Sequence, residues 1–178
     1  ERILKRLAYE ESVRSEINGE EIYYPSANFN ALFILKHSAT HFASTEMSLR
    51  QLLDWGTFVL KHGKDVDWDF VIKVAKQYNL YHFMSCQNAL CIDCFGFQSD
   101  TFPKFERNKE LETRVLNDIL SPEFNKKVPE GFLKGLLFKY ERWRANVWKH
   151  KITFPESLTE TLLTQLFAHI QKPASLKN

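Results

Sequence analysis

Two histidines one helical turn apart are the first side chains here whose type and spacing could do chemistry. His37 and His41 lie in residues 26–44, a segment that is otherwise apolar nearly all round and that we expect to form a buried helix. At about 100° per residue they share one narrow stripe with Asn30 and Ser44. Two interpretations remain open: a pair of hydrogen-bonded core histidines, or a polar cluster that binds a ligand or an ion.

A second polar stripe follows in residues 48–62, the next predicted helix. Arg50 and Asp54 share one face of this helix, opposite a leucine-rich face, and are spaced to form an i, i+4 ion pair. The short connection between the two helices favours antiparallel packing, which would let the stripes meet. The predicted substrate-binding site consists of His37, His41, Arg50, Gln51 and Asp54.

A basic segment with interleaved tryptophans lies toward the C-terminal end. Residues 132–151 carry six Lys or Arg side chains against one Glu, and a long helix is predicted over residues 130–149. This helix is either a solvated face with inward-packed tryptophans, or a surface that contacts the phosphates of a nucleotide, a nucleic acid or an anionic membrane. The phosphate-contacting candidates are Lys139, Arg142 and Arg144.

Three cysteines and a histidine invite a zinc interpretation, which helix geometry opposes. On one helix, His82 and Cys94 would stand about 18 Å apart along the axis, whereas zinc ligands lie within about 2.3 Å of the metal. We therefore expect Cys86, Cys91 and Cys94 to be core residues. The small, odd number of cysteines favours a reducing, cytoplasmic location.

Other catalytic signatures are missing from the sequence. Neither a glycine-rich phosphate loop nor a serine-nucleophile or cysteine-protease motif occurs. Asp65, Asp67 and Asp69 alternate at a predicted helix start, where capping and first-turn charges explain them. We assign no catalytic residue and no metal ligand in this chain.

The elements that must position these residues are mostly helices. The 178 residues include 15 Phe, 6 Tyr and 4 Trp, which excludes disorder, and no apolar run approaches the roughly 20 residues of a membrane span. Asn18-Gly19 between two apolar runs predicts a β-hairpin. Helices are predicted over residues 1–14, 26–44, 48–62, from 67, 80–95, 106–120, 130–149 and from 155. The predicted fold class is mainly α: a bundle of about six to eight helices with one N-terminal β-hairpin.

Several motifs together resemble a known family. They are H-x-x-x-H-F at residues 37–42, L-R-Q-L-x-D-W at 49–55, V-D-W at 66–68, and W-K-H-K-I at 148–152 with the later F-P-E-S and A-H-I-Q-K-P. Over about residues 17–175 the chain resembles the C-terminal helical portion of the uncharacterised nucleotidyltransferase family, of the Bacteroides type. This family is distantly related to the DNA polymerase β superfamily and is often associated with bacterial surface polysaccharide loci.

The resemblance implies nucleotidyl transfer to an unknown acceptor from a nucleoside triphosphate; nucleic acid is not an expected partner. In that superfamily, carboxylates of an Asp-x-Asp-like strand region hold Mg²⁺. This chain has no such motif after a strand, so we expect it to follow the catalytic half and to be inactive alone, with Mg²⁺ required by the full-length protein. The family often has glycines where this chain has Glu46 and Ser48. Because this chain lacks those glycines, it departs from the family in the loop that would close tightly over a ligand.

The expected organisation has three parts: residues 1–25 end a nucleotidyltransferase-like domain, residues 26–120 form a helical domain, and residues 121–178 hold the basic helix and a terminal helix. Two alternatives to the nucleotidyltransferase interpretation stay open. One is a non-catalytic helical interaction module that binds a protein or an anionic partner. The other is a metal-dependent hydrolase built on His37, His41 and Asp54.

Overall fold

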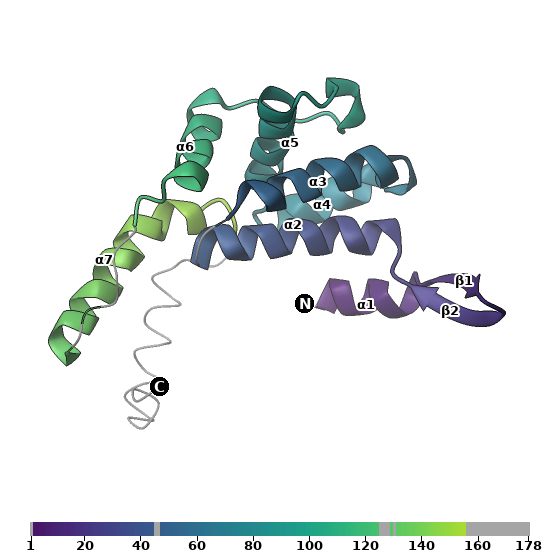
Figure 1. The fold of residues 1–178 in the computed structure, drawn as a ribbon, viewed down its shortest axis with the longest axis horizontal. Coiled ribbons are helices and arrows are strands. Elements are labelled where there is room, and N and C mark those ends of the chain that lie inside the picture. The colour runs from purple at the N-terminus through teal and green to yellow at the C-terminus, as the bar shows by residue number, and fades with distance from the viewer. Residues whose placement is uncertain (1, 45–46, 125–128, 130, 156–178) are drawn as a thin grey trace.

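A computed structural model describes residues 2–44, 47–124, 129 and 131–155 (Figure 1). In this part of the chain there are seven α-helices, two short 3-10 turns and one β-hairpin, which confirms the predicted fold class. The helices are α1 (Arg2–Glu10), α2 (Ala27–Ser44), α3 (Leu49–His62), α4 (Trp68–Gln77), α5 (Tyr81–Phe95), α6 (Lys109–Leu120) and α7 (Phe132–His150), and the strands are β1 (Val13–Ile17) and β2 (Glu20–Tyr24). The helix predicted from residue 155 falls almost wholly outside the described residues.

The hairpin extends away from the helices at one end of the molecule (Figure 1). Its two turn residues have positive φ, 55° at Asn18 and 84° at Gly19, as the Asn-Gly signal predicts. The pairing starts at Val13, which lies opposite Tyr24. The helix predicted over residues 1–14 therefore ends at Glu10, because residues from 13 onward are needed for the strand.

Side-chain caps define the starts of three helices. Ser26, Asp67 and Asn108 each accept a hydrogen bond from the backbone N–H three residues further along, at 3.1, 3.0 and 3.0 Å. The helices predicted to start at residues 26 and 67 are confirmed, and Ser26 and Asp67 are the residues that cap them. Helix α6 was predicted from residue 106 but begins at Lys109, because Asn108 is its cap.

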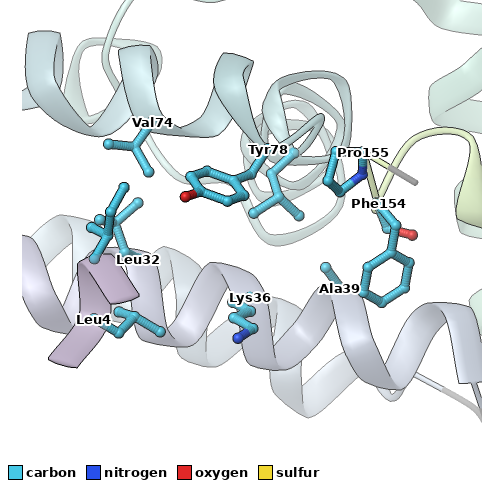
Figure 2. Close-up of a pocket in the computed structure, with 11 residues that line it drawn as sticks. Leu4, Leu32, Lys36, Ala39, Val74, Tyr78, Phe154 and Pro155 are labelled. Atoms are coloured by element: carbon cyan, nitrogen blue, oxygen red, sulfur yellow. The ribbon is translucent and has the colours of Figure 1, made fainter. Parts of the chain in front are cut away.

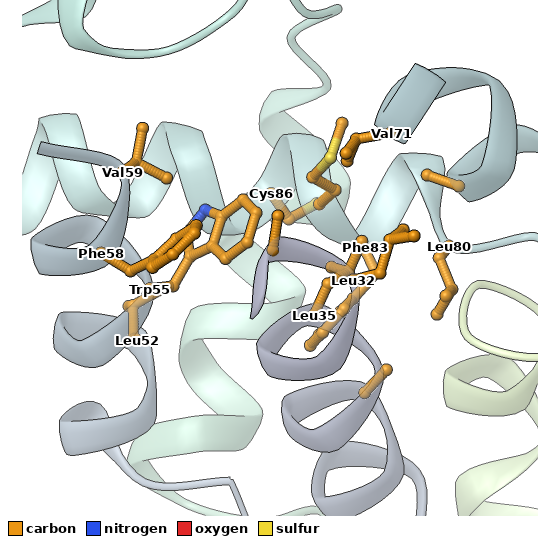
Figure 3. Close-up of a cluster of buried hydrophobic side chains, with 14 of the residues drawn as sticks. Leu32, Leu35, Leu52, Trp55, Phe58, Val59, Val71, Leu80, Phe83 and Cys86 are labelled. Carbon is orange, nitrogen blue, oxygen red and sulfur yellow. The ribbon is translucent and has the colours of Figure 1, made fainter. Parts of the chain in front are cut away.

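Helix α5 is the centre of the core. All nine residues from position 83 to position 91 are buried. Helix α5 stands across the antiparallel pair α2 and α3 (Figure 1) and packs most extensively against α3. Trp55 and Leu52 of α3 and Leu35 of α2 are fully buried against it (Figure 3). The same cluster continues to Leu7 in α1. None of the described helices is both long and apolar enough to cross a membrane.

Two buried amides on α5 fix its neighbours by hydrogen bonds. The Gln87 Nε2 donates to Ser38 Oγ of α2 at 3.1 Å, and the Trp55 Nε1 of α3 donates to Asn88 Oδ1 at 2.8 Å. Both amide side chains are fully buried. Since a buried polar group without a partner is costly, each bond restricts how its helix can rotate about its own axis.

A charged cluster joins the end of α5 to the start of α6. The Arg107 guanidinium pairs with Asp93 and with the buried Glu112, and Lys109 pairs with both carboxylates. Burial acts to raise the pKa of the Glu112 carboxyl, but hydrogen bonds from Arg107 and the Asn108 N–H outweigh it and lower that pKa. Hydrogen bonds from Arg107 and Lys109 likewise lower the pKa of Asp93.

Replacing Trp55 with Phe should destabilise the fold. The substitution leaves Asn88 Oδ1 buried without a donor, and we expect the free energy of unfolding to fall by about 1–3 kcal/mol. Trp143→Phe is the matched control, since its buried indole N–H has no hydrogen-bond partner among the described residues. Urea unfolding measures both variants; an equal loss in the two would show that the Trp55–Asn88 bond contributes nothing.

The charged cluster predicts an acid-sensitive stability. Carboxylates whose pKa is lowered by folding stabilise the protein above their unfolded pKa, and that contribution is lost as the pH falls through the folded pKa. Stability should therefore decline below the ordinary value of 4.5 for Glu112. In urea unfolding between pH 6 and pH 2.5, Glu112→Gln should flatten this decline, whereas Glu110→Gln, at an exposed position, should keep it. A wild-type slope in Glu112→Gln would contradict this assignment.

Candidate functional site

The exposed face of α2 carries a row of rings that contains both predicted histidines. Phe29, Phe33, His37 and His41 follow one another every four residues, with successive ring centres 5.8, 5.9 and 4.6 Å apart. Phe33 is 48% exposed, His37 is exposed and His41 is half-buried. We call these four residues the α2 ring row.

This exposure corrects the expectation that α2 is a buried helix. Only the face with Leu35, Ser38 and Phe42 enters the core, because the Ser38–Gln87 bond holds that face against α5. The interpretation of a core histidine pair is therefore wrong for His37. The remaining members of the polar stripe bond locally: Asn30 Nδ2 donates to the Pro25 carbonyl and Ser44 Oγ to the carbonyl of residue 40.

Of the three predicted site residues on α3, two are exposed and one forms a hydrogen bond at the start of the helix. Arg50 and Asp54 are both exposed, and within the described residues no ion pair joins them. Gln51 is committed to the helix start, where its Oε1 accepts a hydrogen bond from the Ser48 N–H at 2.9 Å. Leu53, 42% exposed, leaves an apolar side chain beside this polar face.

The two helices that carry the predicted site are direct neighbours. Helices α2 and α3 contact each other and run in opposite directions (Figure 1), so the ring row and the Arg50–Asp54 face lie on adjoining elements. In the part of the chain that the structure describes, His37, Arg50 and Asp54 have no hydrogen bond or ion pair. Convergence of all five residues on one ligand stays a prediction.

The three basic candidates on α7 do not share one side of the helix. Lys139 is exposed, while Arg142 donates a hydrogen bond to the Ser44 carbonyl at the end of α2. Arg144 lines an open cleft between α6 and α7. Residues two positions apart point about 200° from each other, so Arg142 and Arg144 serve different surfaces.

Sequence reasoning missed the burial of Lys149. Its ammonium lies 2.6 Å from Asp118 Oδ2 and 5.2 Å from the centre of the Phe42 ring, and only 1% of the residue is exposed. Lys149 therefore connects α7 to α6 and α2 and is not part of a solvated basic face. The one available signal was Asp118, an acidic residue within the apolar periodicity of α6.

The aspartates at the start of α4 and the three cysteines do not form a metal site among the described residues. Asp67 caps α4, and nowhere in the described residues do three or more His, Cys, Asp or Glu side chains assemble. Cys86 and Cys91 are buried, as predicted, and burial raises the pKa of each thiol to about 12. Cys94 is exposed, so the core prediction is wrong for that residue.

An apolar cavity lies on the other side of α2, between α1, α4 and residues 153–155 (Figure 2). Leu32, Ala39, Val74 and Tyr78 line it, with Lys36 at its side. Its volume is about 100 Å³, whereas pockets for nucleotide-sized ligands measure about 300–1,000 Å³. As the described residues line it, this cavity is too small to enclose a nucleotide.

Helices α2 and α3, which carry the predicted site, lie in a segment that matches a known protein family by sequence. A sequence model of the family described as uncharacterised nucleotidyltransferase matches residues 1–96, more than half of the chain. The chain belongs to this family. The match runs from α1 through α5, so residues 97–175, which also entered the resemblance drawn from the sequence, lie outside it. Neither a curated protein nor a solved structure matches the chain.

Removing one partner of the buried ion pair should be costly. Lys149→Met leaves the Asp118 carboxylate buried without its counter-charge, and we expect a loss of about 3–5 kcal/mol in the free energy of unfolding. Lys151→Met, at an exposed position, is the control and should change little. The double variant Lys149→Met/Asp118→Asn should recover part of the loss in urea unfolding; a Lys149→Met loss no larger than the control's would refute the pairing.

Proposed function

We propose that this chain forms the helical, substrate-contacting part of a nucleotidyltransferase and is not catalytic alone. The observation that carries this proposal is the position of His37, Arg50 and Asp54. All three are exposed on adjoining helices inside the matched residues 1–96, and none has a hydrogen bond or ion pair among the described residues. Exposed polar groups without an internal partner are free to bind a ligand.

The chemistry of these side chains suits a nucleotide and its acceptor. The Arg50 guanidinium has the fork geometry that binds phosphate oxygens. The Asp54 carboxylate accepts hydrogen bonds from hydroxyl groups, such as those of a sugar, and the His37 ring can donate or accept. The Phe33 ring beside His37 is 48% exposed and offers an apolar contact to a base. Together they support a nucleoside triphosphate as the ligand class.

The Mg²⁺ ion that the family implies does not fit the described residues. Asp67 directs its carboxylate to the first turn of α4, and its neighbours Asp65 and Asp69 do not assemble with it into an oxygen-rich cluster. We therefore derive no transfer step from this chain. Mg²⁺ and the activation of the acceptor would then belong to carboxylates of the full-length protein outside these residues.

We further propose a cytoplasmic location and a sugar-containing acceptor for this protein. Three cysteines without a disulfide and a nucleoside triphosphate substrate both suit the cytoplasm. A bacterial surface polysaccharide precursor is the acceptor that the motif resemblance favours. Its sugar hydroxyls would be the groups that Asp54 recognises.

A second candidate function is a non-catalytic interaction module. The observation in its favour is the apolar exposure on α3, where Leu49, Leu53 and Leu60 are 40%, 42% and 60% exposed. Exposed leucines along one helix are typical of a protein-binding surface. Association with a protein partner that Leu53→Asp abolishes, in the absence of nucleotide binding, would favour this function.

Nucleotide binding tests the first proposal. In isothermal titration of the full-length protein with ATP, GTP, CTP and UTP in turn, at least one should bind. Arg50→Ala should weaken that binding by roughly 10- to 100-fold, since a hydrogen bond to a charged group contributes about 1.5–3 kcal/mol. Lys73→Ala on α4, also exposed, is the matched control. If no nucleotide binds, or if both variants lose affinity equally, the proposal fails.

A further inference from the structure

We propose that His37 and His41 together bind a divalent first-row transition-metal ion, such as Zn²⁺, Ni²⁺ or Cu²⁺, on the exposed face of α2. The inference does not depend on the proposed function, because it needs neither a nucleotide nor an acceptor. It rests on the placement of two imidazoles four residues apart on one face of a long helix, where His37 is exposed and His41 is half-buried.

The imidazole rings of His37 and His41 lie close together on α2. Their centres are 4.6 Å apart and their planes meet edge to face at 74°. A metal–nitrogen bond of about 2.0–2.1 Å places the centre of a coordinating imidazole about 3.2 Å from the ion. An ion bound by one nitrogen of each ring would see the two ring centres, 4.6 Å apart, at about 90°, an angle that square-planar and octahedral ions accept.

The helix and a neighbouring ring restrict the positions of the two imidazoles. Both residues belong to the 18-residue helix α2, four positions apart, where side chains of one face are neighbours. The His37 ring also stacks on Phe33, at 5.9 Å and an interplanar angle of 9°. A pair that is already close loses little conformational entropy when an ion binds.

The nitrogen ligands determine which class of ion can bind. Neutral imidazole suits Zn²⁺, Cu²⁺ and Ni²⁺, whereas Mg²⁺ prefers oxygen ligands. This ion is therefore distinct from the Mg²⁺ that the family implies. Within the described residues no third His, Cys, Asp or Glu joins the pair. A bound oxygen ligand, such as a phosphate, can occupy a further coordination position of the ion.

Metal titration without nucleotide tests this inference. We expect the full chain to bind Zn²⁺, Ni²⁺ or Cu²⁺ in isothermal titration at pH 7.5, with one high-affinity site. His37→Ala and His41→Ala should each weaken that site by about tenfold or more, since either variant leaves a single imidazole. His62→Ala and His82→Ala are the matched controls, because both histidines are exposed and lie on other helices; they should leave the affinity unchanged.

The outcomes separate this inference from the proposed function. Arg50→Ala should retain wild-type metal affinity even where it loses nucleotide binding. Circular dichroism of each histidine variant should give the wild-type helical spectrum, which ties any loss to the ligands. Absence of a high-affinity site, or an equal loss in the His82→Ala control, would overturn the metal site and leave the nucleotide proposal standing.

Discussion

The hydrogen bonds that buried α5 makes to its two neighbours determine which surfaces this protein exposes. Gln87 bonds to Ser38 and Asn88 bonds to Trp55, and both amides are inaccessible to water. Rotation of α2 or α3 about its axis would break its bond and leave a buried amide without a partner, at a cost of about 1–3 kcal/mol. The exposure of His37 and Arg50 follows from this constraint.

Ion pairs attach the later helices to that core. The Arg107 cluster joins α5 to α6, and the buried Lys149–Asp118 pair joins α6 to α7. The α7 connection also involves α2, because Lys149 lies over the Phe42 ring and Arg142 bonds to the end of α2. Much of the basic character of α7 therefore serves structure.

The features that the sequence predicted correctly are local. Asn18-Gly19 predicts its hairpin because few other residue pairs tolerate positive φ at both positions, and Ser26 and Asp67 predict helix starts because each cap needs only its own backbone. The missed features depend on distant residues. The end of α1 depends on strand pairing with Tyr24, and the burial of Lys149 depends on Asp118, 31 positions away in sequence.

In the candidate site, too, the sequence predicted the neighbours within each helix but not the exposure and capping roles of the residues. Helical spacing correctly placed His37 beside His41 and Arg50 on the same α3 face as Asp54. Spacing identified the polar stripe that contains His37 but could not show that this stripe faces solvent, because a buried stripe of hydrogen-bonded side chains has the same period. Nor could it show that Gln51 has a capping role, since this depends on where α3 begins.

Backbone amide chemical-shift mapping is the most direct test of the central claim that the α2–α3 face contacts a nucleotide. The full-length protein would be titrated with its preferred nucleoside triphosphate and Mg²⁺. We predict shifts concentrated around His37 and His41 in α2 and between Arg50 and Asp54 in α3. Shifts confined to the α6–α7 cleft around Arg144, with α2 and α3 unchanged, would contradict the claim.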